Sequence, residues 1–340
     1  MSRPPEQLRV LDFGRVSPLR SQTLWHAVSY GVSATRQPTL SFVRPDAPYV
    51  CVGYHRSMAE VDLAACAAAG WPVYRRMVGG GPVWLDDGQL FFQITLPADA
   101  VSAFRTQALR DLLTPAVTAF QAAGVDAVLD DALEIVVGDR KICGHGAGQI
   151  EDAVVVCGNL IQRFDHRAAT TALRLPSQQL REDVERLMRR YVQATPVQAP
   201  TFTQAAVTAY GQALGLAPVE GELTPFERQV VDELDAQFTD PDWLAGPARA
   251  ERPAAQVKVR SGVWLFEAER AGTRAVVSVV DGRIERARLI DPQLNGSTAA
   301  AERALLGQSL PAAGQVLAGY GPAGRRLSDV LALADRRGSL

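Results

Sequence analysis

Three consecutive glycines, Gly79 to Gly81, follow two adjacent arginines, Arg75 and Arg76, and this stretch constrains the chain more than any other. A glycine loses more backbone freedom on folding than any other residue, so three in a row rarely benefit a fold by themselves. They suit a place where the backbone comes close to another group, because the exposed N–H groups of such a loop can bind an anion. We therefore expect a binding loop, with a flexible hairpin turn as the alternative.

The two arginines suit the same kind of ligand, since guanidinium groups bind phosphate and carboxylate bidentately. Adjacent side chains of an extended segment point to opposite sides, so only one of Arg75 and Arg76 should reach the ligand of the loop. The loop is not a P-loop, because no Gly-Lys-Ser/Thr follows it. Its glycine spacing also differs from that of a dinucleotide fingerprint.

The length of 340 residues exceeds one average domain, so we expect two domains. The 35 Lys and Arg residues balance 37 Asp and Glu residues, which leaves no net field that would favour nucleic acid or an acidic membrane surface. The four cysteines form no Cys-x-x-Cys pair, which argues against a disulfide framework or a zinc site and suits the cytoplasm. The polar, proline-rich start is no secretory signal, and no apolar run reaches the length of a membrane span.

Apolar, β-prone segments stand on both sides of the loop. Residues 72–77 are expected to form a strand that enters the loop, and residues 89–96 a buried strand that returns from it, so the prediction is a strand–loop–strand hairpin. A long amphipathic helix over 101–123 follows. A second glycine-rich hairpin is expected from strand 132–137, through the turn at 138–141, towards strand 153–161.

The composition changes at residues 216–226, which read as a linker. We place a large domain at 1–218, the linker at 219–225 and a small domain at 226–340. The small domain should contain a first helix, four strands between residues 255 and 290, and two later helices. The predicted fold class is therefore α+β, with a large domain of mixed sheets and helices followed by a small α+β domain.

Two motifs together resemble a known family: Arg75-Arg76-x-x-Gly79-Gly80-Gly81-x-Val83-x-x-Asp86-x-Gly88, and Gly138-Asp139-Arg140-Lys141-Ile142-x-Gly144. The combination is similar to the lipoate–protein ligase A family, which has the biotin/lipoate ligase fold. Val52-Gly53-Tyr54-His55 followed by Glu60-Val61 resembles a third motif of that family. The chain after residue 226 resembles the small accessory domain of the bacterial two-domain ligases. The resemblance thus implies a catalytic domain at 1–218 and an accessory domain at 226–340.

This resemblance implies an acyl-adenylate-forming ligase. Such enzymes activate free lipoate or octanoate with ATP and pass the acyl group to a lysine of a lipoyl-domain acceptor, such as a 2-oxoacid dehydrogenase E2 or a glycine cleavage H protein. Lys141 matches the essential lysine of the family and should stabilise charge on the acyl carbonyl and the adenylate phosphate. Without the resemblance, a solvated lysine in a turn is the alternative. Mg²⁺ should accompany ATP, because a divalent ion neutralises and orients its phosphates.

The resemblance also implies which residues contact substrate and adenylate. Arg76 should hold a carboxylate or phosphate, the three glycines should close over the acyl-phosphate, and Val83 and Trp84 should wall an apolar acyl tunnel. The other predicted binding residues are Arg75, Asp86, Gly144 and His145. Asp130 and Asp131 approximate the Asn-Asp pair that precedes the lysine in the family, and they are the predicted Mg²⁺ ligands.

Several positions depart from the family pattern. Leu85 stands where a histidine is usual, Val78 where a small polar residue is expected, and Cys157 where another histidine is often found. Pro82 replaces an alanine and removes one N–H donor from the loop. The first helix has no Glu within residues 22–26. The chain therefore resembles a divergent branch, in which the acceptor is unusual or part of the activity is lost.

Two alternatives follow from the same residues. Octanoyltransferases share the fold but use a cysteine nucleophile and no ATP. Cys143 and Cys157 are the candidates, although the related transferases carry their cysteine upstream of the lysine strand, where residues 126–137 contain none. Cysteines in strands are most often buried small hydrophobes. The other alternative is a protein that binds lipoyl domains or acyl ligands without turnover. A biotin ligase is disfavoured because its arginine–glycine loop has a different pattern.

Overall fold

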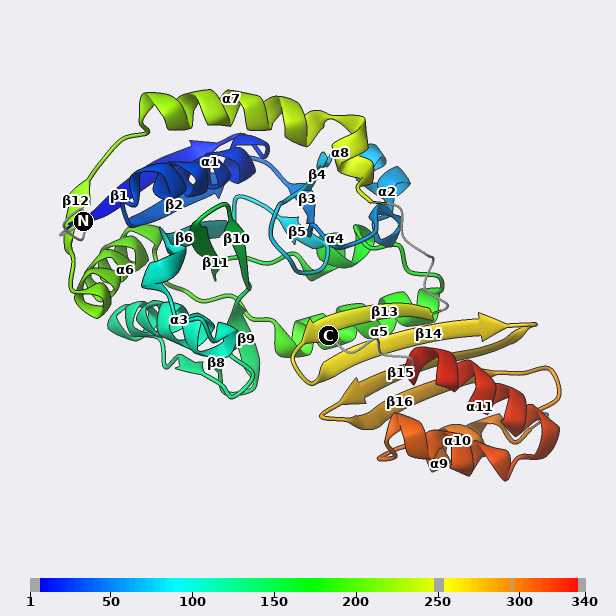
Figure 1. Cartoon of the computed structure of the whole chain (residues 1–340). Coiled ribbons are helices and arrows are strands. Elements are labelled where there is room, and N and C mark those ends of the chain that lie inside the picture. Colours follow the sequence, from blue (N-terminus) through cyan, green and yellow to red (C-terminus); the bar gives the residue numbers. More distant parts are fainter. Residues whose placement is uncertain (1–6, 248–253, 295, 336–340) are drawn as a thin grey trace. The chain divides into compact units, whose positions relative to one another are not determined.

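The computed structural model describes residues 7–247, 254–294 and 296–335, and it divides into two compact units (Figure 1). The first unit comprises Met1–Leu173 and Gln193–Ala248, and the second comprises Arg174–Val192 and Arg249–Leu340. Mixed sheets with helices make up the first unit and a sheet with helices the second, which confirms the α+β class. Within the described ranges, none of the helices combines the length and the apolar character that a bilayer crossing requires.

The two units divide the chain differently from the sequence prediction. The helix at 178–191 belongs to the second unit, although the prediction placed it in the first domain. Helices at 225–239 and 241–245 belong to the first unit, although they follow the predicted linker. Of these three helices, the two long ones at 178–191 and 225–239 bury apolar residues against elements distant in sequence, and a composition profile does not report such contacts.

A six-stranded mixed sheet forms the centre of the first unit, in the order β10–β11–β6–β2–β1–β12. Its strands are β1 (Gln7–Val16), β2 (Thr39–Pro45), β6 (Gln89–Pro97), β10 (His145–Ile150), β11 (Ala153–Ile161) and β12 (Ala217–Glu220). Strand β1 pairs in parallel with both β2 and β12, and the remaining pairs are antiparallel. All nine residues of β6 are buried, as its continuous apolar pattern predicts for a central strand.

Helices cover this sheet and complete the cores of the first unit. Helix α3 (Arg105–Ala122) packs against α6 (Ala199–Leu214), and both contribute to one cluster with the sheet. Helix α1 (Arg20–Thr35) packs along α7 (Pro225–Thr239), which lies over it in Figure 1. The short helices of this unit are α2 (Leu63–Ala69), α4 (His166–Thr171) and α8 (Pro241–Ala245).

A second, three-stranded sheet carries the glycine loop, in the order β4–β3–β5. Strand β3 (Tyr49–Val52) is central; β4 (Val73–Arg75) pairs with it in parallel and β5 (Val83–Leu85) pairs with it antiparallel. The predicted hairpin is therefore wrong, since the strands on either side of the loop pair with β3 and not with each other. All four β3 residues are buried, and this apolar run takes the central place. The predicted returning strand at 89–96 is β6, which belongs to the other sheet.

The lysine segment turns where predicted, but its partner strand differs: residues 135–137 pair with 140–143, whereas the predicted partner at 153–161 pairs with β6 and β10 of the large sheet. Strands β7 (Val128–Leu129), β8 (Ile135–Val137) and β9 (Arg140–Cys143) form a small antiparallel sheet. Gly138 has φ 59°, in the left-handed region, which suits glycine at the tight turn between β8 and β9. After β9 the chain enters β10, at the edge of the large sheet.

The second unit is built on a four-stranded antiparallel meander. Its strands are β13 (Ala254–Arg260), β14 (Val263–Arg270), β15 (Thr273–Val280) and β16 (Arg283–Ile290), close to the predicted segments. The turns Ala271–Gly272 and Asp281–Gly282 have positive φ at both residues, the geometry of tight type I′ hairpin turns. Helices α9 (Thr298–Leu305), α10 (Leu310–Ala318) and α11 (Gly321–Asp335) close one apolar core with this sheet.

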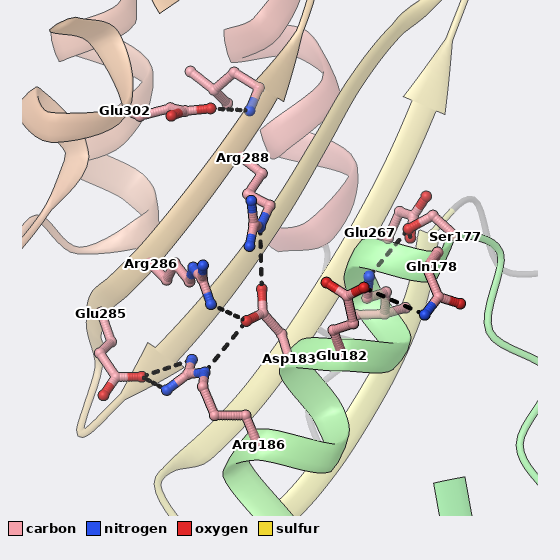
Figure 2. Close-up of polar contacts among 12 residues, drawn as sticks. Ser177, Gln178, Glu182, Asp183, Arg186, Glu267, Glu285, Arg286, Arg288 and Glu302 are labelled. Atoms are coloured by element: carbon pink, nitrogen blue, oxygen red, sulfur yellow. Dashed lines mark hydrogen bonds and ion pairs between the residues drawn. The ribbon is translucent and has the colours of Figure 1, made fainter. Parts of the chain in front are cut away.

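Helix α5 (Gln178–Tyr191) lies against the sheet of the second unit and joins it through charged groups (Figure 2). The buried Asp183 carboxylate accepts from Arg286 at 2.7 Å and from Arg186 at 3.3 Å. The buried Ser177 hydroxyl donates to Glu267 of β14 at 2.5 Å. These bonds connect α5 to β14 and β16, which explains why a helix from the middle of the chain belongs to the second unit.

Candidate active site

The glycine loop passes over the end of the central strand β3. The Val52 carbonyl accepts from the Arg76 N–H at 3.0 Å, and the Val78 carbonyl accepts from the Tyr54 N–H at 3.0 Å. A methyl group on Gly53 would lie 2.1 Å from the Gly80 carbonyl oxygen. Two backbone segments therefore meet at a distance that only glycine at position 53 permits.

Arg75 is a structural residue in this conformation. Its side chain is 1% exposed, and its guanidinium donates to the carbonyls of Gly53, Tyr54 and Arg56 and to those of residues 243–245 at the end of α8. A cavity of about 640 Å³ borders Arg75 together with Tyr54 and Trp243, and neither Lys141 nor the loop glycines line it. Arg75 thus fixes α8 to the β3–β4 region, and its predicted role in binding substrate finds no support in these contacts.

Arg76 points away from Arg75, as the alternation of an extended strand predicts. Its guanidinium donates to the carbonyls of Cys51 at 2.9 Å, Gly79 at 2.8 Å and Gly81 at 3.0 Å. These bonds hold the loop closed on its own arginine. Arg76 therefore lies at the loop, where an anion could replace these carbonyls as its partner.

The glycine loop meets the chain that follows the lysine hairpin. A methyl group on Gly148 of β10 would lie 2.7 Å from Val78 Cγ1, and one on Gly146 would lie 3.8 Å from the Gly79 carbonyl oxygen. Val78 is 2% exposed and clusters with Trp25, Ile150 and Val155. The two glycine-rich motifs of the sequence are thus neighbours in space, with Val78 filling the volume between the loop and β10.

Lys141 extends from β9 and forms an ion pair with Glu134. Its Nζ lies 3.1 Å from Glu134 Oε1, and the two side chains are 19% and 6% exposed. A tight turn places the glutamate: Asp130 accepts from the Glu134 N–H at 2.8 Å, and Leu133 has φ 61°. A leucine in the left-handed region is strained, and such strain is common at functional sites. The turn therefore directs a buried carboxylate at the lysine.

The predicted Mg²⁺ ligands do not form a metal site. Asp130 caps the turn that places Glu134, and Asp131 is exposed. No group of three or more His, Cys, Asp or Glu residues among the described residues is arranged to hold a metal ion. These residues do not fit a dedicated Mg²⁺ site, so an ion that arrives with ATP would depend mainly on phosphate oxygens and water, as Mg²⁺ commonly does.

A chain of buried polar side chains connects two of the predicted motifs. Asp86 accepts from Gln89 Nε2 at 3.3 Å, Gln89 Oε1 accepts from Asn159 Nδ2 at 2.8 Å, and Asn159 Oδ1 accepts from the Gly144 N–H at 2.6 Å. Burial raises the pKa of Asp86, which also accepts from the Gly88 N–H. Asp86 and Gly144 therefore belong to one internal network that positions the lysine segment. His145, half-buried, begins β10 directly after it.

Val83 and Trp84 do not share one wall. They are consecutive in β5 and point to opposite faces of the small sheet. Val83 is 38% exposed, whereas Trp84 is 6% exposed and packs edge-on against Trp71 and Phe164. In this conformation the two side chains do not line one surface: Val83 lies at the surface beside the glycine loop and Trp84 lies in the interior.

The four cysteines are free thiols in environments that disfavour the thiolate. Burial raises the pKa of Cys143 to about 12 and raises the pKa of Cys51, Cys66 and Cys157. A reactive cysteine needs a lowered pKa and access to solvent. None of the four, in this conformation, has the environment of a nucleophile.

Sequence reasoning missed three polar residues of this region. Glu134 was not distinguished from the other carboxylates before the lysine, and Asn159 lies inside an apolar strand, where an isolated amide is a signal of a buried network. His26 of α1 is fully buried, and its Nε2 accepts from the Met77 N–H at 3.1 Å. A histidine on the apolar face of the first helix was its only sequence signal.

The family model for the lipoyl protein ligase A/B catalytic domain matches residues 22–208. Octanoyltransferase LipM of Kyrpidia tusciae is 26% identical over 267 residues, which are 69% of this chain and 97% of the relative. Lipoate-protein ligase A subunit 1 of Thermoplasma acidophilum is 24% identical over 253 residues, 70% of this chain and 94% of the relative. The chain is thus similar both to a transferase and to a ligase.

Solved structures agree with this grouping at the level of the fold. The bipartite lipoate protein ligase of Thermoplasma acidophilum, studied with its E2 lipoyl domain, matches with a TM-score of 0.65 at 23% identity, over 72% of this chain and 98% of that chain. A lipoate-protein ligase A bound with ATP matches with a TM-score of 0.59 at 22% identity, over 71% and 99%. Since the family model covers more than half of the residues and the fold agrees, this chain belongs to the lipoyl protein ligase A/B catalytic-domain family.

Proposed function

We propose that this chain is an ATP-dependent lipoate–protein ligase. It activates free lipoate or octanoate to an acyl-adenylate and transfers the acyl group to a lysine of a lipoyl-domain acceptor. Two similar proteins support the proposal: one is named as a subunit of a lipoate-protein ligase, and another is a ligase that binds ATP. The reaction needs a cation at the activated carboxyl group and a loop that can hold phosphate.

The observation that carries the proposal is the position of Lys141. It stands beside the buried Glu134 carboxylate, on the hairpin that leads into the glycines packed against the loop. Of the 35 basic residues in the chain only two are lysines, Lys141 and Lys258, so an ammonium group is a rare choice in an arginine-rich protein. The lysine ammonium is a compact point charge that can bind single oxygen atoms. It can therefore stabilise negative charge as it develops on the acyl and phosphate oxygens.

Arg76 and the loop supply the remaining groups for an anion. The guanidinium rests on the carbonyls of Gly79 and Gly81, and a carboxylate or phosphate is a stronger partner for it than a neutral carbonyl. Gly80 and Gly81 are exposed, so their backbone is accessible to a ligand. We infer that an incoming acyl-phosphate takes over the Arg76 bonds and that the loop then closes on it. Mg²⁺ bound to ATP would neutralise its phosphates.

The second candidate is an octanoyltransferase, which the similarity to LipM proteins favours. That reaction uses a cysteine nucleophile and an acyl-thioester in place of ATP. The environments of the cysteines argue against it, since burial raises the pKa of each of the four thiols. A protein that binds lipoyl domains without turnover is the third reading. It would need neither Lys141 nor ATP.

The acceptor and the compartment are part of the same proposal. A similar ligase is paired with an E2 lipoyl domain in Thermoplasma acidophilum, so an E2 or a glycine cleavage H protein is the first acceptor to test. All four cysteines are free, which suits the reducing cytoplasm.

The deciding experiment is incubation of the purified protein with ATP, Mg²⁺, free lipoate and a lipoyl domain, followed by the intact mass of the lipoyl domain. We expect a lipoyl mass shift that requires ATP. Lys141→Ala should lower the transfer rate by about 10²–10³-fold, the effect of removing one preorganised charge-stabilising group. Lys258→Ala is the matched control, because it removes the other lysine of the chain, on a strand of the second unit.

Each failure points to a different conclusion. Pyrophosphate release without a mass shift means that activation works and the acceptor is wrong. A shift obtained only from an octanoyl-acceptor thioester, without ATP, overturns the ligase in favour of the transferase. Binding of the lipoyl domain with neither product leaves the non-catalytic reading. Normal transfer by Lys141→Ala refutes the role of this lysine.

A further inference from the structure

The glycine loop is fixed at its base by residues from two helices distant in sequence. The Met77 N–H donates to Nε2 of His26 on α1 at 3.1 Å. The indole N–H of Trp243 on α8 donates to the Arg75 carbonyl at 3.0 Å. The peptide groups on both sides of Arg76 are thus held by side chains, while the Arg76 N–H itself donates to the Val52 carbonyl.

His26 acts in this contact as an acceptor. Its Nδ1 faces the Gln22 carbonyl at 2.7 Å, so the ring proton lies on Nδ1 and the Nε2 lone pair faces Met77. The pKa of His26 is lowered to about 3, mainly because the ring is buried; the bond to Gln22 opposes this shift and the Arg76 charge adds to it. The imidazole is therefore neutral near pH 7, and no proton on Nε2 competes with the bond to Met77.

Aromatic packing connects the two contacts. The Phe238 ring of α7 meets the His26 ring edge-on at 5.0 Å and stacks on the Trp243 ring at 5.5 Å. The three rings of His26, Phe238 and Trp243 thus form a contiguous row that joins the contact at Met77 to the contact at Arg75. Phe238 and Trp243 lie beyond residue 208, where the family match ends. The helices α7 and α8 therefore add packing behind the loop that the matched catalytic region does not include.

We propose that His26 and Trp243 are positioning residues that clamp the backbone on either side of Arg76. The clamp fixes the base of the loop while the Arg76 guanidinium exchanges carbonyl partners for an anionic ligand. The reason is energetic. If the backbone at residues 75–77 moved with the Arg76 side chain, the free energy of ordering this backbone would be added to each binding event. The inference deepens the proposed function and rests on it only for the identity of the anion.

The test uses four variants of the full-length protein. His26→Phe keeps an aromatic ring and removes the acceptor, whereas His26→Gln offers an amide oxygen near the position of Nε2. Trp243→Phe replaces the indole by a phenyl ring, so the N–H donor is lost with the five-membered ring while an aromatic ring remains to stack on Phe238. Ser29→Ala is the matched control, because Ser29 is also buried in α1 but donates only to Trp25 of its own helix.

Amide hydrogen exchange of the ligand-free protein is measured first, since it requires no activity. We expect His26→Phe and Trp243→Phe to accelerate exchange over residues 73–82 about tenfold, with residues 89–97 of β6 unchanged as the internal reference. Ser29→Ala should match the wild type, and His26→Gln should restore most of the protection. In the acyl-transfer assay the two clamp variants should raise KM for ATP or lipoate more than they lower kcat.

The outcomes separate the clamp from the proposed function. Unchanged exchange over 73–82 in both clamp variants overturns the clamp, whatever the activity. Equal acceleration over 73–82 and 89–97 also overturns it, because the residues would then stabilise the whole unit and not the loop. If the wild type shows no acyl transfer while local exchange responds as expected, the clamp stands and the proposed function fails.

Discussion

Lys141 carries its ammonium group 3.1 Å from Glu134, and this pair decides how the lysine meets a ligand. Glu134 is buried, so the pair is screened less by water than a surface salt bridge. The pairing fixes the long lysine side chain in one place and reduces the rotamer freedom that it would lose on binding. The turn at Asp130 and Leu133 positions this carboxylate, since Asp130 accepts from the Glu134 N–H.

Replacing Glu134 by Gln should therefore weaken acyl transfer without unfolding the protein. The amide keeps the shape and removes the charge, and loss of a charged hydrogen bond costs about 1.5–3 kcal/mol. We expect kcat/KM to fall about 10–100-fold. Asp131→Asn is the control, because Asp131 is exposed, and it should stay within about twofold of the wild type. A stronger effect of Asp131→Asn than of Glu134→Gln would restore the Mg²⁺ hypothesis.

The glycine loop and the strand end beneath it require glycine for different reasons. Gly53 is required by the backbone of Gly80 in the protein itself. Gly81 has open space around its missing side chain and no positive φ, so nothing in the ligand-free structure requires glycine there. A requirement for glycine at position 81 would come from the ligand.

Gly81→Ala should distinguish a requirement of the bound ligand from a requirement of the protein's own fold. We expect its thermal stability to stay within about 0.5 kcal/mol of the wild type, while KM for ATP or lipoate rises about tenfold. Gly53→Ala should instead lower stability by about 1–3 kcal/mol, because its methyl group meets a backbone oxygen. Thermal unfolding and steady-state kinetics of the two variants check this. If Gly81→Ala binds its substrates normally, the loop does not close on them at this position.

On the scale of the whole molecule, the first unit closes with residues that follow the predicted linker. Helix α7 buries Val230, Val231, Leu234 and Phe238 beside α1. Its buried Glu227 accepts from Arg9 of β1 at 2.9 Å. The charge and the apolar face of α7 are thus part of the first unit's core.

Truncation tests this division. A chain that ends at residue 224 should unfold at least about 10 °C below one that ends at residue 247, because each large apolar side chain of α7 contributes about 1.5–3 kcal/mol when buried. Both chains leave α5 without its sheet, so the difference between them isolates α7 and α8. Thermal unfolding followed by circular dichroism gives the comparison. Equal unfolding temperatures would mean that residue 224 is the true boundary of the first unit.

The sequence by itself determined the local elements and the identity of the two motifs. The glycine turns of the meander, the turn that precedes Lys141, the long helix over 105–122 and the opposite directions of Arg75 and Arg76 all depend on neighbours within a few residues. Turn chemistry and strand alternation are local properties, so a sequence reports them directly.

The tertiary structure decided which elements meet. In the structure, β3 lies between the two strands that flank the glycine loop, and Lys141 pairs with Glu134. Helix α5 belongs to the second unit and helix α7 to the first. The tertiary structure also brought His26 and Trp243 to the two sides of Arg76, 217 positions apart in the chain. Pairing and burial over such separations depend on the shape of the whole unit, and no pattern within a short window encodes them.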